Sequence, residues 1–307
     1  MELIVTTESG YKKEMMQNNH VYNSPEFCLL NQSKCECIHW LLFKYKHIRG
    51  GIILGERNGV LYSPFSAPFG GFNFLRTDIN LQMINQCCTL LADYCNQSGL
   101  GIEIKMPPLI YNPALISKQI SVFKLSGYNV LCADLNYAIE LDSFQEYRDQ
   151  LSRNARKNLN IALKEDYHFF KAETIAEKAL AYDIIRENRA GKDYSLRMTK
   201  EQVMDTATCV SADFFILSLG DVPVASAILF QVTKDIMQVI YWGDKPGYSV
   251  SKPMNILPLK LVEYYKQRNI KILDIGPSSE EGIPNFGLCE FKEGIGCSVS
   301  LKYTFQL

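Results

Sequence analysis

The spacing of apolar residues predicts alternating strands and helices in the first half of the chain. Two apolar runs joined by a glycine-bearing turn, 38–45 and 50–57, are typical of a β-hairpin. Apolar residues recur at helical spacing over 78–99, a segment that ends in Ser98-Gly99, a natural helix stop. The predicted elements of this half are strands at 38–45, 50–57, 101–106 and 130–141 and helices at 78–99 and 112–128.

The second half repeats this alternation after a predicted helical segment at about 143–165. Three apolar runs between residues 214 and 243 predict an antiparallel meander. The predicted elements are strands at 167–173, 214–219, 224–232, 235–243, 270–276 and 297–305 and helices at 175–190, 199–209 and within 253–268. The similar order of elements predicts two related α/β domains, 1–142 and 143–307, each a mixed, mostly antiparallel sheet flanked by helices.

Composition limits the classes of function. The formal net charge of −1 excludes a strongly basic nucleic-acid binder and leaves room for a local basic patch. The first residues lack a basic segment followed by a long apolar run, so no secretory signal is expected. No apolar stretch approaches the roughly 20 residues that span a bilayer. We therefore expect a cytoplasmic protein with no integral membrane segment, whose ten cysteines are thiols.

Motifs for metals and phosphates are missing. The four histidines form no His-Glu-x-x-His pair, and Cys35-x-Cys37 and Cys87-Cys88 do not have the Cys-x-x-Cys spacing of a zinc site. His39 lies in an apolar strand and is predicted to be structural, so we expect no metal. There is no Walker motif and no Gly-x-Gly-x-x-Gly, and Cys289 is predicted to be an inert thiol.

The clearest charge feature is LSRNARKNLNIALK at 151–164, which has four basic residues and no acidic one. On a helix, the polar residues share one face and apolar residues share the opposite face. Two interpretations stay open: a solvated helix face, or an electrostatic track for a phosphate-bearing substrate beside a cleft between the domains. The polar face holds Arg153, Arg156, Lys157, Asn160 and Lys164, and the apolar face Leu151, Ala155, Leu159 and Ala162.

The other feature is the segment 270–296, in which a strand ends at Asp274-Ile275-Gly276 and a polar loop follows. Ligands of α/β sheets bind beyond the C-terminal ends of strands. Here the Lys292 ammonium, beside Phe291 and flanking glycines, either stabilises an oxyanion or extends to water while Phe291 anchors the loop. The residue chemistry leaves these two alternatives even.

Taken in order, four segments resemble the FemAB-like branch of the GNAT acyltransferase superfamily. They are SAPFGGF at 66–72, LSRNARKNLNIALK, LDIGPSSEEG at 273–282 and GLCEFKEGIG at 287–296. The resemblance implies two tandem GNAT-like domains. It also implies the transfer of an amino acid from aminoacyl-tRNA to an amine of a peptidoglycan precursor, or a role in cell-envelope polysaccharide systems. The lysine of the Phe-Lys pair is implicated in catalysis in the family, which assigns that role to Lys292, with Phe291 shaping the site.

The resemblance also bears on which donor is used. CoA-using GNAT enzymes hold pyrophosphate on a glycine-rich loop, whereas the matching segment here is DKPGYSVSKPMNILPLK, with Pro253 and Pro258 near the helix start. Proline lacks an amide donor, which argues against acetyl-CoA. No coiled-coil insertion of the kind found in some tRNA-dependent members is present. The substrate-binding candidates are Arg153, Arg156, Lys157, Tyr241, Asp274 and Gly276.

The prediction is therefore an enzyme, an N-acyltransferase that transfers an aminoacyl group to an amine of a cell-envelope precursor. No cofactor is expected to be bound permanently; the acyl donor is aminoacyl-tRNA or acyl-CoA, and the acceptor is a small molecule or an envelope precursor. The alternatives are a CoA-dependent N-acetyltransferase and a non-catalytic binding protein on the GNAT fold. Lys292 is expected at the mouth of a cleft in the second domain.

Overall fold

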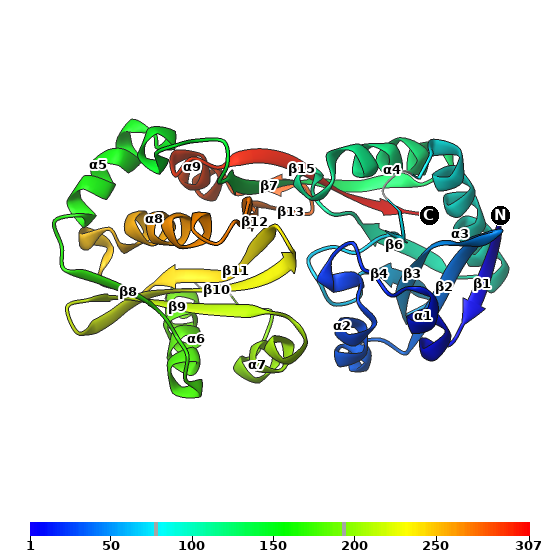
Figure 1. Ribbon diagram of the computed structural model, residues 1–307, viewed down its shortest axis with the longest axis horizontal. Helices are drawn as coiled ribbons and strands as arrows, with labels where there is room; N and C mark the ends of the chain where they lie inside the picture. Colours follow the sequence, from blue (N-terminus) through cyan, green and yellow to red (C-terminus); the bar gives the residue numbers. More distant parts are fainter. Residues whose placement is uncertain (77–78, 192–194) are drawn as a thin grey trace. The chain divides into compact units, whose positions relative to one another are not determined.

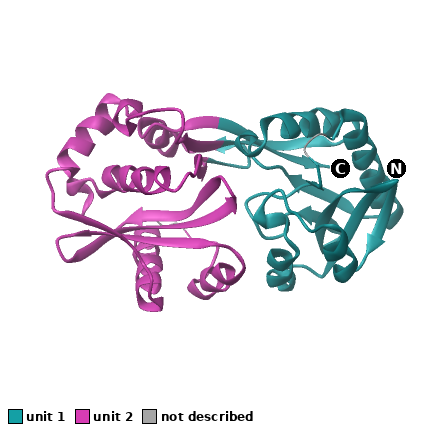
Figure 2. Ribbon diagram, in the orientation of Figure 1, with its two compact units in different colours: residues 1–135, 279–283, 300–307 teal, residues 136–278, 284–299 magenta. Residues whose placement is uncertain are grey.

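The computed structural model describes residues 1–76, 79–191 and 195–307, which form two compact units (Figures 1 and 2). In the described residues, no helix has the length and apolar character needed to cross a membrane. The predicted domain boundary at 142/143 lies close to the change of unit after Leu135, and two short C-terminal segments return to the first unit. Unit 1 comprises residues 1–135, 279–283 and 300–307, and unit 2 comprises residues 136–278 and 284–299.

Unit 1 is built on β-strands of mixed direction that include the predicted hairpin. The hairpin strands β2 and β3 are antiparallel, β4 and β6 are parallel, and the last strand, β15, pairs antiparallel with β6. The order is β1-β2-β3-β4-β6-β15, and β5 pairs with β3. The strands are β1 (Glu2–Thr6), β2 (Cys37–Tyr45), β3 (His47–Arg57), β4 (Val60–Ser63), β5 (Asn73–Phe74), β6 (Gly101–Lys105) and β15 (Ser298–Gln306).

The helices of unit 1 begin and end where the chain supplies caps. The Asn80 side chain accepts a hydrogen bond from Met83 N–H at the start of α3, and Gly99 ends that helix in the left-handed region at φ +67°. Asn112 caps α4 in the same way, with Pro113 in its first turn. The helices are α1 (Glu8–Glu14), α2 (Pro25–Leu30), α3 (Leu81–Ser98) and α4 (Pro113–Leu125).

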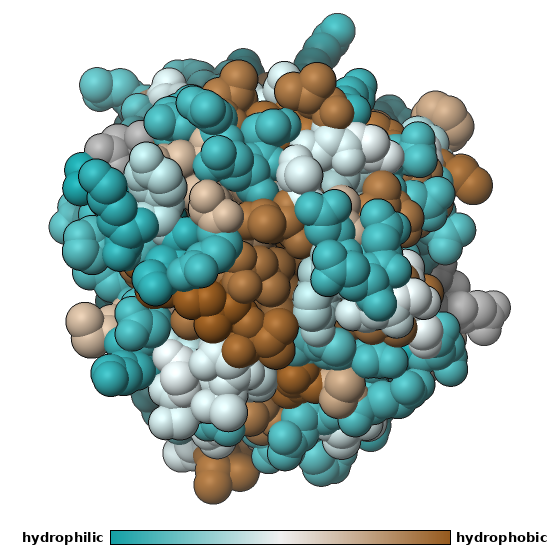
Figure 3. Space-filling view, turned by 90° about the vertical axis from the view of Figure 1, so that its right-hand side faces the viewer, coloured by the Kyte–Doolittle hydropathy of each residue, from teal (hydrophilic) through white to brown (hydrophobic). Residues whose placement is uncertain are grey.

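Apolar residues of the sheet and of α3 and α4 make the main core of unit 1. This core includes Cys87, Cys88 and Cys95, and all ten cysteines of the chain are free thiols, as predicted. Figure 3 shows one face of the molecule, on which apolar side chains gather near the middle and polar side chains surround them. Several apolar residues packed against the core are only partly buried, among them Leu3, Leu90 and Leu100.

The strands of unit 2 are also of mixed direction, and the predicted meander lies among them. β9, β10 and β11 are successive antiparallel neighbours, and β12 joins β11 in parallel. The order is β7-β12-β11-β10-β9-β8. The strands are β7 (Asn129–Glu140), which begins in unit 1, β8 (Tyr167–Lys171), β9 (Ala212–Leu219), β10 (Val222–Thr233), β11 (Ile236–Asp244) and β12 (Ile272–Pro277). The short strands β13 (Ser279–Glu280), in the segment 279–283 that belongs to unit 1, and β14 (Ile283–Pro284) pair with each other.

Helices cover both faces of the unit 2 sheet. On β9, the Phe214 ring faces the ammonium of Lys178 on α6. The next residue, Phe215, contacts Tyr264 and Tyr265 of α8. Because successive side chains of a strand point to opposite faces, α6 and α8 lie on opposite faces of β9 (Figure 1). The helices are α5 (Arg153–Ala162), α6 (Ile175–Ala190), α7 (Lys200–Cys209), α8 (Pro253–Lys266) and α9 (Phe286–Gly294).

Two predicted segments of unit 2 differ from the structure. The helical segment expected at 143–165 is a short 3-10 turn at Tyr147–Gln150 followed by α5, which Ser152 caps. The residues around Lys292, expected in a loop, form α9, because the Asn285 side chain accepts from Leu288 N–H and starts a helix there.

Candidate active site

The C-terminal end of β12 is irregular, and this irregularity builds the site. Pairing between β12 and β7 shifts register between Asp274 and Gly276, and Gly276 has φ +78°. A Cβ at Gly276 would meet nothing within 4 Å, so glycine is needed for its backbone conformation and not for space. Successive carbonyls of a regular strand point in alternating directions, whereas here three successive carbonyls face one point.

That point is the ammonium of Lys292. Its Nζ donates to the carbonyl oxygens of Ile275 at 3.1 Å, Gly276 at 2.9 Å and Pro277 at 2.9 Å. Three acceptors require three N–H donors, so this geometry fits the charged form of the side chain. The residue is only 3% exposed, and this burial lowers the pKa of Lys292 from 10.5 to about 8. Lys292 is therefore a buried cation held by backbone.

The carboxylate of Asp274 supports the same turn from within the sheet. It is fully buried and accepts hydrogen bonds from Asn136 Nδ2 at 2.8 Å, Gln238 Nε2 at 2.6 Å and Gly276 N–H at 2.9 Å. These donors come from β7, β11 and β12 itself. Since Asp274 bonds to the residue two positions ahead, it fixes the turn that presents the carbonyls to Lys292.

Aromatic side chains surround the ammonium and α9. Lys292 Nζ lies 5.5 Å from the centre of the Tyr137 ring, and Tyr137 Oη donates to Glu293 at 2.9 Å. Burial, followed by the neighbouring Cys289 and Glu293, raises the pKa of Tyr137. Phe291 is half-buried and meets Trp242 edge to face, with ring centres 6.2 Å apart. Phe291 therefore anchors α9 on β11.

Helix α5 begins where α9 ends. Ser152, the N-cap of α5, donates its N–H to the carbonyl of Gly294 at 2.9 Å, and Tyr147 Oη donates to the carbonyl of Ile295 at 2.8 Å. The basic helix and the Lys292 helix are thus joined end to end within unit 2. Two segments far apart in the sequence, 147–152 and 294–295, make this junction.

The two faces of α5 agree with the predicted pattern. Ala155, Leu159 and Ala162 are buried. The polar side chains form an open hollow of about 330 Å³ on the opposite side. Among the described residues, no acidic group lies within 4.0 Å of a basic group of this face, so the hollow is positively charged. Its lining is Arg153, Arg156, Lys157, Asn160, Ile161 and Lys164.

The start of α8 has few free amides, as the sequence predicted. Pro253 occupies the first turn and has no N–H, and the N–H of Asn255 already donates to the carbonyl of Lys252 at 3.0 Å. Lys252 itself is in the left-handed region at φ +60°. Such a helix start lacks the successive free amides that hold a phosphate group.

The structure brings some predicted residues together and separates others. Lys292, Asp274 and Gly276 belong to one hydrogen-bonded cluster. The predicted basic residues lie on α5, whose start is hydrogen-bonded to the end of α9. Tyr241 lies on β11, where its Oη accepts from Met198 N–H at 3.1 Å, and burial raises the pKa of Tyr241. The expected position of Lys292 at the mouth of a cleft is wrong, because the carbonyls of β12 hold its ammonium inside the protein.

Sequence reasoning missed the two amide side chains that hold Asp274. Gln238 is a polar residue in the apolar strand IMQVIYWG, and a buried polar residue needs a partner. That rule could have identified it, whereas Asn136 lies in a strand with several other polar residues and gives no such signal.

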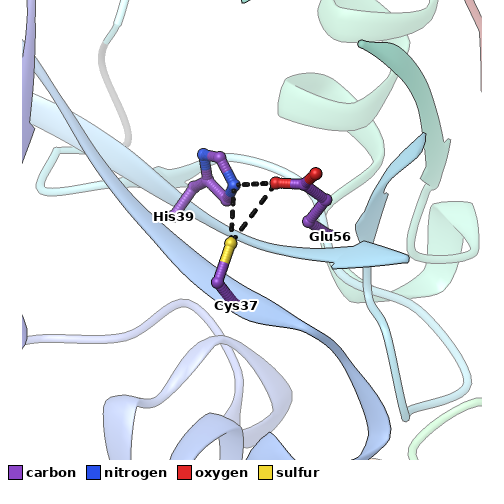
Figure 4. Close-up of side chains that lie close together, drawn as sticks. All are labelled: Cys37, His39 and Glu56. Carbon is purple, nitrogen blue, oxygen red and sulfur yellow. Dashed lines mark hydrogen bonds and ion pairs between the residues drawn. The ribbon is translucent and has the colours of Figure 1, made fainter. Parts of the chain in front are cut away.

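Unit 1 holds a separate cluster of side chains of the types that bind metals (Figure 4). Glu56 Oε2 lies 2.9 Å from His39 Nε2 and 3.3 Å from Cys37 Sγ, and the sulfur and the imidazole nitrogen are 3.2 Å apart. Partial burial and the Glu56 carboxylate raise the pKa of Cys37 to about 11. The hydrogen bond to His39 lowers the pKa of Glu56. His39 was predicted to be structural, and it does have partners here.

Solved structures share the fold of the whole chain, although no family model and no curated protein matches the sequence. FemX is 10% identical, with coverage of 100% of this chain and 97% of that one, at a TM-score of 0.72. L-PGS from Bacillus licheniformis is 12% identical, with coverage of 97% and 90%, at a TM-score of 0.61. A tandem GNAT protein from the clavulanic acid biosynthesis pathway is 7% identical, with coverage of 100% and 98%, at a TM-score of 0.53. The predicted fold class is confirmed: the chain shares the α/β fold of FemX and of the tandem GNAT protein.

Proposed function

We propose that this chain is an N-acyltransferase that transfers an aminoacyl group to an amine of a cell-envelope precursor. The observation that supports it most is the fold that the chain shares, from end to end, with FemX at a TM-score of 0.72. The likenesses to L-PGS and to a tandem GNAT protein support the same class of reaction. Fold alone does not fix chemistry, so the proposal also depends on the residues of unit 2.

In the proposed reaction, the acceptor amine attacks the ester carbonyl of the aminoacyl donor. An amide bond forms, the ester bond breaks, and the ribose oxygen of the donor leaves with a proton from the amine. Negative charge develops on the carbonyl oxygen before the ester bond breaks, and a nearby cation stabilises it. Lys292 is our candidate for this cation, and Phe291 positions its helix against Trp242.

The contacts of Lys292 set a condition for this role. All three N–H groups already donate to backbone carbonyls. To donate to the oxyanion or to the leaving ribose oxygen, Lys292 must exchange one carbonyl for the substrate. The carbonyl of Ile275 makes the longest of the three bonds, at 3.1 Å, and is the first candidate for exchange.

The basic face of α5 supports a donor that carries phosphates. Arg153, Arg156 and Lys157 lie on one side of α5, and the start of α5 is hydrogen-bonded to the end of α9. A phosphate chain bound along α5 would therefore lead toward α9. The start of α8 argues against CoA, because the first turn has neither a Pro253 N–H nor a free Asn255 N–H for a pyrophosphate. We therefore propose aminoacyl-tRNA as the donor.

The competing function is a non-catalytic binding protein on this fold. The satisfied and buried Lys292 favours it, because a side chain with every donor already used needs no substrate to explain it. The α5 hollow would then be the binding surface.

A donor screen separates these functions. The full chain is incubated with aminoacyl-tRNA or acyl-CoA, with an envelope precursor or free amines as acceptors, and amide formation is followed by mass spectrometry. The proposal expects product from aminoacyl-tRNA, unchanged in Lys234→Met, an exposed lysine on a β-turn, and reduced at least a hundredfold in Lys292→Met. Product from acyl-CoA alone would replace the proposed donor. Binding to α5 without turnover of any donor would favour the binding protein.

A further inference from the structure

The cluster in unit 1 lies on two paired strands of the sheet. Cys37 and His39 are two residues apart on β2, so their side chains point to the same face. Glu56 of β3 is the registered partner of Cys37 and therefore shares this face. Figure 4 shows the three side chains converging from the two strands. Paired strands hold these groups more firmly than a loop would.

The distances fit the coordination sphere of one small cation. Zinc bonds of about 2.0–2.3 Å in tetrahedral geometry place neighbouring ligand atoms roughly 3.3–3.6 Å apart. The three ligand atoms here are 2.9, 3.2 and 3.3 Å apart, so a movement of a few tenths of an ångström admits the ion. A thiolate, an imidazole and a carboxylate together suit zinc better than magnesium or calcium, which prefer oxygen ligands alone.

The contact behind His39 is also the one that metal-binding histidines make. Its Nδ1 lies 2.6 Å from Tyr94 Oη on α3. With Nε2 bound to a metal, Nδ1 carries the ring proton and its N–H donates a hydrogen bond to the Tyr94 hydroxyl. This bond fixes the tautomer and the ring orientation. In the metal-free protein the same contact satisfies the second ring nitrogen of His39. Cys37 is exposed, so an ion can enter from solvent.

We propose that Cys37, His39 and Glu56 bind one Zn²⁺ ion, with Tyr94 positioning His39. Binding replaces the hydrogen bonds among the three side chains with three bonds to the metal, and the Cys37 thiol gives its proton to solvent. Three protein ligands leave a fourth position for water or another ligand. The site lies wholly in unit 1 and does not depend on the proposed acyltransferase activity.

Cobalt is the probe that identifies the ligands. The full chain, without a histidine tag, is stripped with a chelator and titrated with Co²⁺ and then with Zn²⁺. The proposal expects one Co²⁺ per chain, a near-ultraviolet charge-transfer band that only a thiolate ligand gives, and loss of that band when Zn²⁺ is added. Binding of Co²⁺ without the band, or no binding, overturns the proposal.

Matched variants locate the site. Cys37→Ser and His39→Asn should abolish the band and weaken Zn²⁺ binding more than about 100-fold, whereas Tyr94→Phe should weaken it about 10–100-fold with the band retained. Two controls should bind as the wild type: Cys35→Ser, whose thiol donates to a backbone carbonyl, and His47→Gln, at the other end of the hairpin.

Thermal unfolding with and without Zn²⁺ keeps the test valid if a variant loses stability. Zn²⁺ should raise the Tm of the wild type and of both controls and leave the Tm of Cys37→Ser unchanged. An equal rise in Cys37→Ser would place the metal elsewhere and refute the proposal.

Discussion

Replacing Lys292 by Met tests whether the buried ammonium holds the end of β12 together. Met has similar length but no donor, so the carbonyls of Ile275, Gly276 and Pro277 lose their partner. Three hydrogen bonds from a charged donor contribute at least about 4.5 kcal/mol. Burial of the charge offsets about 3 kcal/mol, since it lowers the pKa from 10.5 to about 8. The expected net loss in unfolding free energy is about 1–2 kcal/mol.

Denaturant unfolding at pH 7 measures this loss. Lys234→Met is the control, because that lysine is exposed and its replacement should change stability by less than about 0.5 kcal/mol. If Lys292→Met is as stable as the wild type, the three hydrogen bonds contribute no more than burial of the charge costs, which refutes the expected net stabilisation.

The same variant predicts how stability depends on pH. The folded pKa of Lys292 lies below its unfolded value of 10.5, so between about pH 8 and 10.5 the unfolded chain binds more protons. The stability of the wild type relative to Lys292→Met should therefore rise over this window by up to about 3 kcal/mol and be lost as pH falls through 8. A difference that falls over the window would show that the carbonyls keep the pKa high.

Two further substitutions test the neighbouring features. Gly276→Ala should lower stability by roughly 1–2 kcal/mol although its Cβ has open space, because its φ is +78°, whereas Gly287→Ala, in α9 with ordinary φ, should not. Arg153→Glu with Lys157→Glu should reduce the slope of log Kd against log salt for aminoacyl-tRNA by about 1.4–1.8, and an unchanged slope would exclude phosphate contacts there. Lys234→Glu is the charge control for this pair.

Most of the helices and strands with capping residues or a clear apolar period were predicted from the sequence. The α6 helix was predicted at 175–190 and lies there, where Thr174 and Glu177 form a capping box. The meander and both long helices of unit 1 followed from apolar spacing. The short strands β1 and β4 contain too few residues to show an alternation of apolar and polar positions, and both were missed.

The site was predicted only in part, because its geometry depends on contacts between distant residues. Lys292 and Gly276 were singled out, and they are in contact. What local sequence could not show is that Gly276 turns three carbonyls toward one amine, since this requires the register shift against β7. Without those acceptors, a lysine beside a phenylalanine is expected to reach water.

In the proposed reaction, Lys292 exchanges one hydrogen bond to a backbone carbonyl for a hydrogen bond to the substrate. A lysine that binds only carbonyls stabilises the fold, and a lysine that donates to a substrate must leave one of them unpaired for a moment. The carbonyl it leaves belongs to the turn that Asp274 and Gly276 hold in place, so the turn need not move when the bond is exchanged. A preorganised turn of this kind lowers the cost of the exchange, because the turn itself does not have to be rebuilt. The rigid backbone around Lys292 is therefore compatible with a catalytic role and sets the geometry in which the substrate must arrive.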